Sequence, residues 1–101
     1  MAPLTSKQRA FLRSLAHPLK PILQVGAEGV SEAFVRSLDE AFRTRELLKV
    51  KVLDTAPLEA KEVADALPER LPGAQVAQVI GRTVVVYRPF PDQPEIKLPT
   101  R

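Results

Sequence analysis

The sequence predicts a single α/β (α+β) domain in which three helices pack on a mixed four-stranded sheet, in the order α-β-α-β-α-β-β. First, the 101 residues suffice for one hydrophobic core but not for two. Second, segments with helical apolar periodicity alternate with short β-rich runs, which favours two strand–helix–strand units with partly parallel strands. Third, two β-rich runs near the end flank Gly81-Arg82, which predicts an antiparallel hairpin.

The first helix is predicted from Thr5 to about Ala16. Thr5-Ser6-Lys7-Gln8 has the pattern of a capping box, in which the first and last side chains each bond a backbone N–H of the other residue. Pro18 prevents the helix from continuing, because proline disfavours helical geometry in the residue before it. The apolar run at residues 22–25 then predicts a short buried strand. The apolar side of the helix consists of Leu4, Phe11, Leu12 and Leu15.

A second helix is predicted from Ser31, a favourable N-cap, to about Glu46. Residues 48–52 alternate between apolar and charged side chains, which is typical of a strand with one face toward water. Lys49 and Lys51 are therefore expected on that wet face. The core-facing side of the helix consists of Phe34, Leu38 and Phe42, which recur every four residues.

Pro57 suits the first turn of a third helix, which Pro68 is expected to kink or end and Pro72-Gly73 to close. Residues 75–80 and 83–88 then form two strands, joined at Gly81-Arg82 by a type II′ turn. The core-facing side of the third helix consists of Ala60, Val63, Ala64 and Leu67.

The chain ends in a proline-rich segment with prolines at positions 89, 91, 94 and 99. Such a composition favours an extended or loose conformation. We therefore divide the chain into a folded domain, residues 1–90, and a Pro-rich C-terminal tail, residues 91–101.

Positive charge is concentrated in the first half of the chain. The net charge is +3, yet residues 1–51 hold nine Lys/Arg and five Asp/Glu, and residues 52–101 hold six and seven. Residues 1–25 carry four cations and no acid. This asymmetry favours a polyanionic partner on one side of the molecule, with a merely solvated helix face as the alternative of similar weight.

Composition argues against several kinds of chemistry. The absence of cysteine excludes disulfides, thiolate catalysis and zinc sites built on sulfur, and His17 alone cannot form a protein-only metal cage. No nucleophile elbow or phosphate-binding Lys-Ser/Thr pattern occurs. We therefore expect no enzyme, no catalytic residue, no metal and no cofactor. The lack of a signal peptide or long apolar run predicts a cytoplasmic protein that does not contact membranes. We further expect a monomer.

Gly26-Ala27-Glu28-Gly29 lies between an apolar strand-like run and a helix start. Two glycines at this spacing let the backbone bend sharply and let another backbone approach, next to helix N–H groups that favour an anion. Single-stranded nucleic acid is bound by loops of the same pattern. A plain tight turn without a ligand is the alternative.

Four stretches of the sequence, taken together, resemble one known family: residues 15–21, 25–30, 47–51 and 79–88. Their order and spacing are similar to those of the CRM domain (chloroplast RNA splicing and ribosome maturation), and above all to its free-standing bacterial YhbY-like members. The likeness runs from about Leu4 to Pro89. It implies a fold similar to the C-terminal domain of bacterial translation initiation factor three.

The resemblance implies RNA binding through the Gly-x-x-Gly loop and neighbouring cations. Bacterial members of the family are associated with precursors of the large ribosomal subunit, which implies a role in ribosome biogenesis. The expected partners are therefore large-subunit rRNA or its precursor, within the pre-ribosomal particle. The alternative is a protein-interaction module that docks on a ribosomal protein or assembly factor. DNA also stays open as a partner, because backbone contacts discriminate poorly between the two nucleic acids.

The family pattern places Gly26 and Gly29 in its loop and Arg82 and Arg88 at basic positions around its hairpin. Glu28 departs from it, because relatives usually have small, polar or basic residues in the middle of the loop. An exposed acid there opposes a phosphate by about 1 kcal/mol or less. The residues expected to contact RNA are Gly26, Ala27, Glu28, Gly29, Lys7, Arg9, Arg13, Lys20, Lys49, Lys51, Arg82 and Arg88.

Overall fold

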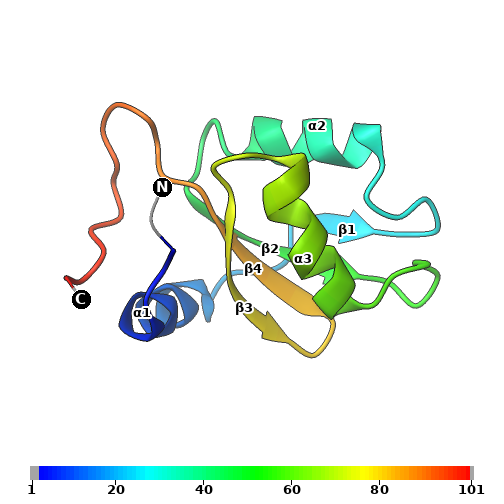
Figure 1. The fold of residues 1–101 in the computed structure, drawn as a ribbon, viewed down its shortest axis with the longest axis horizontal. Helices are drawn as coiled ribbons and strands as arrows, with labels where there is room; N and C mark the ends of the chain where they lie inside the picture. The colour runs from blue at the N-terminus through cyan, green and yellow to red at the C-terminus, as the bar shows by residue number, and fades with distance from the viewer. Residues whose placement is uncertain (1–2, 101) are drawn as a thin grey trace.

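The computed structural model describes residues 3–100, in which three helices pack on the two faces of one four-stranded sheet (Figure 1). The strand order is β1-β2-β4-β3. β1 pairs parallel with β2, and β4 pairs antiparallel with both β2 and β3, so the predicted mixed sheet is confirmed. The elements are α1 (Ser6–Ala16), β1 (Leu23–Val25), α2 (Glu32–Ala41), β2 (Leu47–Val52), α3 (Ala60–Arg70), β3 (Gln75–Ile80) and β4 (Thr83–Tyr87).

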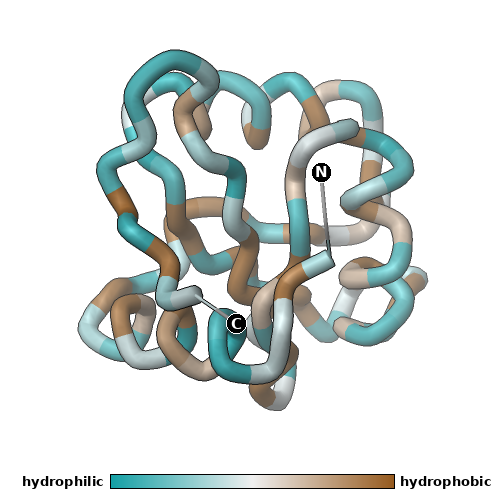
Figure 2. Tube along the Cα trace, turned by 60° about the vertical axis from the view of Figure 1, so that its left-hand side comes forward, coloured by the Kyte–Doolittle hydropathy of each residue, from teal (hydrophilic) through white to brown (hydrophobic). Residues whose placement is uncertain are grey.

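The prediction of one hydrophobic core is wrong, because two cores lie on opposite faces of the sheet. The larger core lies between the sheet and α2 with α3, and the alternate β2 residues Leu48, Val50 and Val52 point into it. The smaller core lies under α1, where Leu12 and Ala16 pack on the other face. Hydrophilic stretches dominate the outer turns of the chain (Figure 2). Among the described residues, no helix has the length and apolar composition that crossing a bilayer requires.

The start of α1 confirms the capping box. The backbone N–H of Gln8 donates to Thr5 Oγ1 at 3.1 Å, and the backbone N–H of Thr5 donates to Gln8 Oε1 at 3.0 Å. The apolar side of the helix is narrower than predicted, because Leu15 is exposed rather than packed. The cause is that α1 covers only part of its sheet face, so the end of its stripe extends past the core.

The predicted end of the second helix is wrong, since α2 stops at Ala41 and not near Glu46. The backbone changes there to the tighter geometry of a 3₁₀ turn. The N–H groups of Arg43 and Thr44 donate to the carbonyls three residues earlier in the chain, instead of four. The predicted buried strand at 22–25 is also wrong at its first residue. Ile22 precedes β1 and is 47% exposed.

The third helix begins later and ends later than predicted. Its N-cap is Glu59, so Pro57 lies in the preceding loop. Pro68 lies inside the helix and does not end it, so the helix continues to Arg70 without a backbone donor at position 68. Pro72-Gly73 does close it, with Gly73 at a φ of +95°.

The predicted hairpin turn is confirmed at Gly81-Arg82. Gly81 has a φ of +58°, and positive φ occurs only at glycines among the described residues. A type I′ turn would need positive φ at both central residues, so the pair forms the type II′ turn.

The Pro-rich segment has no helix or strand up to residue 100, yet it packs on the domain. Ile96 and Leu98 pack on the smaller core, and Gln8 Nε2 donates to the carbonyl of Pro99 at 3.1 Å. The carboxylate of Glu46, 4% exposed, accepts backbone hydrogen bonds from this segment. The segment is therefore extended and held in place, and Figure 1 shows it passing beside α1.

Candidate nucleic-acid interface

The loop of residues 26–29 joins β1 to α2 through a tight turn, in which the N–H of Gly29 donates to the carbonyl of Gly26 at 2.9 Å. Gly29 has a φ of +66°, and an added Cβ would lie 3.4 Å from Pro57 Cγ. At Gly26 an added Cβ would meet only ordinary contacts, the nearest at 3.8 Å. The fold itself therefore requires glycine at Gly29 but not at Gly26.

The loop has one packed side and one open side. Leu53, Thr55 and Pro57, from the segment after β2, pack against the glycines. On the other side lies a shallow groove of about 400 Å³, which runs between β1 and the start of α2. Ala27 and Glu28 are exposed at the tip. A polynucleotide backbone can therefore approach this turn from the groove side.

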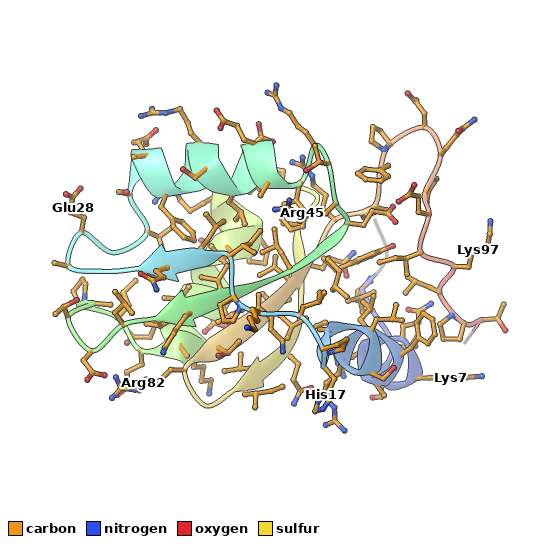
Figure 3. All side chains as sticks on the ribbon, turned by 180° about the vertical axis from the view of Figure 1, so that it is seen from behind. Lys7, His17, Glu28, Arg45, Arg82 and Lys97 are labelled. Atoms are coloured by element: carbon orange, nitrogen blue, oxygen red, sulfur yellow. The ribbon has the colours of Figure 1, made fainter. Side chains whose placement is uncertain are left out.

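The hairpin tip lies at the same end of the sheet as the loop. Because β1 and β2 are parallel, the segments that follow them leave the sheet together. The N–H of Val52 donates to the carbonyl of Arg82 at 2.8 Å, which places the hairpin beside the end of β2. The guanidinium of Arg82 pairs with Asp54. Glu28 and Arg82 thus lie at one end of the molecule (Figure 3).

A second group of predicted residues gathers on the sheet face that carries α1. Lys49 and Lys51 lie on this face, and Lys49 Nζ donates to the carbonyl of Leu19 at 3.0 Å. Lys51 is exposed. Arg13 and Lys49 line a groove of about 660 Å³ between α1 and β3. Lys20 lies in the exposed segment that links α1 to β1.

The remaining predicted cations line neither the groove beside the loop nor the groove between α1 and β3. Lys7 is at the opposite end of the molecule from Glu28 (Figure 3). Arg9 donates to the carbonyl of Leu4 at 3.1 Å. Arg88 lies between α2 and β4, with its Nη1 atom 2.8 Å from Asp39 Oδ1 and its guanidinium carbon 5.1 Å from the ring centre of Phe42. The structure thus brings together only part of the predicted set.

The pair of Arg88 and Asp39 predicts a stability effect at low pH. The hydrogen bond from Arg88 is the main cause that lowers the pKa of Asp39 below its usual 3.8. The ionised carboxylate therefore stabilises the fold above that value, and this contribution is lost as the pH falls through the lowered pKa. We expect Asp39→Asn to flatten the acid side of the stability profile below about pH 4, measured as urea midpoints. An unchanged slope would contradict the assignment.

Sequence reasoning missed several residues of these surfaces. Arg70 donates to the carbonyl of Val30 and lies 3.4 Å from Glu32 Oε1, so it ties the end of α3 to the exit of the loop. Ile22, just before β1, and Ile80, at the end of β3, are exposed. No local signal in the sequence showed that α1 leaves this part of the sheet face open.

Comparisons with known proteins agree with this architecture. The CRS1/YhbY (CRM) domain matches residues 4–88. The "Probable RNA-binding protein YqeI" of Bacillus subtilis is 43% identical in sequence to this chain. The alignment covers 95% of this chain and 99% of the Bacillus protein. An "RNA-binding protein" of Haemophilus influenzae is 37% identical over 100% of both chains.

A solved structure shows the same fold. The solution structure of a Staphylococcus aureus protein, whose name proposes RNA binding, has a TM-score of 0.79 and 42% identity to this chain. It covers 95% of this chain and 99% of its own. The match of sequence and fold spans both the loop of residues 26–29 and the hairpin. The chain therefore belongs to the CRS1/YhbY (CRM) domain family.

Proposed function

We propose that this protein binds RNA, chiefly through the sugar-phosphate backbone. The observation that supports this proposal most strongly is the uneven distribution of acidic residues between the two helix layers and the sheet. α1 and all four strands contain no Asp or Glu, so the 12 acids of the chain lie on α2, α3, the loops and the tail. A phosphate chain that follows the α1 face therefore meets cations without like-charge repulsion from that layer. The names of the relatives, which describe RNA-binding proteins, support the same partner.

In this proposal the loop and the α1 face have different tasks. The loop of residues 26–29 admits the sugar-phosphate chain from its groove side, next to the start of α2. Arg13, Lys49 and Lys51 neutralise phosphates on the sheet face. Contacts of this kind position the RNA and carry little sequence information. We infer from the family resemblance that the RNA is large-subunit rRNA or its precursor, bound in the pre-ribosomal particle.

An RNA titration at several salt concentrations tests the proposal. Neutralising three to four phosphates should make the logarithm of the binding constant fall with the logarithm of salt, with a slope of about −2 to −4. The measurement is fluorescence anisotropy of labelled large-subunit rRNA fragments. A binding constant that does not change with salt, or no binding at low salt, would overturn the proposal.

Glu28→Gln provides a test at the loop itself. Glu28 is exposed at the tip, and glutamine keeps its shape while removing its charge. Removing an exposed like charge beside a phosphate should tighten RNA binding by up to about fivefold at low salt, because such a pair is worth about 1 kcal/mol or less. The gain should disappear in high salt. If the variant binds more weakly than the unchanged chain, the loop does not face a phosphate.

A further inference from the structure

The exposed hydrophobic side chains lie on one layer of the molecule. In the part of the chain that the structure describes, the large hydrophobic residues with the highest exposure are Ile80 at 49% and Ile22 at 47%, followed by Leu15 and Leu19. They belong to α1, to the segment that links it to β1, and to β3. This is also the layer that contains no acid.

The strand register aligns side chains across the whole sheet on this face. Gln24 pairs with Lys51, Lys51 with Thr83, and Thr83 with Ile80, so one row crosses all four strands. Directly paired residues point to the same face of a sheet. The row spans about 14 Å, because neighbouring strands lie about 4.8 Å apart. We call the surface formed by Gln24, Lys49, Lys51, Gln78, Ile80 and Thr83 the sheet shelf.

The sheet shelf is bounded by a helix on one side and by the candidate loop on the other. Arg13, Ser14 and His17 of the α1 end form the wall of the groove above Lys49 and Ile80. At the opposite side, Gln24 lies two residues before Gly26 in the chain. The shelf and the loop of residues 26–29 therefore form one continuous path over the molecule.

The chemistry of the sheet shelf suits unpaired nucleotides. Lys51 and Arg13 supply positive charge for phosphates, and the amides of Gln24 and Gln78 can donate to and accept from base edges. Ile80 supplies an apolar surface for the face of a base. A paired helix presents phosphates and riboses on its outside, so it offers no partner for exposed isoleucines.

We propose that the sheet shelf binds an unpaired stretch of the same RNA whose backbone enters at the loop of residues 26–29, an inference that rests on the proposed function. The loop then fixes the position of the strand, and the shelf selects single-stranded over paired RNA. The specificity of this protein for RNA is accordingly one of structure, unpaired against paired, more than of base sequence.

The test compares one RNA sequence as a single strand and as a full duplex. Lys51→Gln removes one shelf charge, and Ile80→Thr removes apolar surface while keeping a β-branched residue in the strand. Arg45→Gln is the matched control, because it removes one charge from an exposed side chain that lies away from both Glu28 and Arg82 (Figure 3). Thermal unfolding confirms that each variant is folded.

We expect the unchanged chain to bind the single strand at least about tenfold more tightly than the duplex. Lys51→Gln should weaken single-strand binding and flatten its salt slope by about 0.7. Ile80→Thr should weaken single-strand binding about threefold or more without changing that slope, since its contribution carries no charge. Arg45→Gln should retain the single-strand affinity within about twofold.

Two outcomes would overturn the inference while the proposed function stands. One is equal affinity for single strand and duplex. The other is that Lys51→Gln and Ile80→Thr bind RNA as tightly as the unchanged chain. The sheet shelf would then be assigned to binding of a protein partner. If the unchanged chain binds neither form at low salt, the proposed function itself fails and the inference falls with it.

Discussion

Replacing Glu46 by alanine is expected to lower the free energy of unfolding by about 3 kcal/mol and to release the C-terminal segment from the domain. The Glu46 carboxylate accepts from the N–H groups of Phe90 at 2.7 Å, Glu95 at 2.9 Å and Ile96 at 2.7 Å. Alanine leaves these three donors without an acceptor, and each costs about 1 kcal/mol or more where water cannot replace it. Detachment of the segment limits the total loss, because the freed donors then bond to water.

Chemical denaturation of Glu46 variants, in the full chain and in a shortened chain, separates this mechanism from a simple packing defect. Glu46→Gln keeps one acceptor oxygen and should lose less stability than Glu46→Ala. A chain that ends at residue 88 should already lack the stabilisation, so Glu46→Ala should cost it little further. If the substitution costs the shortened chain as much as the full chain, the carboxylate does not act through the C-terminal segment.

Local signals in the sequence predicted most elements of the fold. The capping box at Thr5, the alternation along β2 and the turn at Gly81-Arg82 each depend on residues within a few positions of one another. Glu46 shows where such signals fail. A glutamate next to a helical stripe resembles a continuing helix, but its partners lie 44 to 50 residues further along the chain. No local pattern encodes that contact.

The individual residues of the candidate site could be predicted from the sequence, but which of them lie together in space could not. The loop of residues 26–29 and the face of Lys51 followed from the glycine spacing and from the strand alternation. Which cations lie together depends on the strand order, and β4 inserts between β2 and β3. Arg88 therefore lies against α2, paired with Asp39, while Lys51 lies on the opposite face. The exposure of Ile80 likewise follows from how little of the sheet α1 covers.

Converting the loop tip to two aspartates, Ala27→Asp with Glu28→Asp, is expected to weaken RNA binding by up to about fivefold. The double variant adds one exposed negative charge beside a phosphate, and such a pair is worth about 1 kcal/mol or less, as for Glu28→Gln. Both positions are exposed within a turn, where aspartate is favourable, so the fold should keep its stability within about 0.5 kcal/mol. Anisotropy titrations at about 0.1 M salt measure the affinity.

Arg45→Gln lowers the net charge by the same amount as the double variant, at a site away from Glu28 (Figure 3). It should bind RNA almost as tightly as the unchanged chain, because surface charges beyond a Debye length of about 10 Å are largely screened. Equal losses in the two variants would show that binding responds to total charge and not to contact at the loop. A double variant that binds normally, together with weak binding by Lys51→Gln, would move the entry point of the strand from the loop to the sheet face.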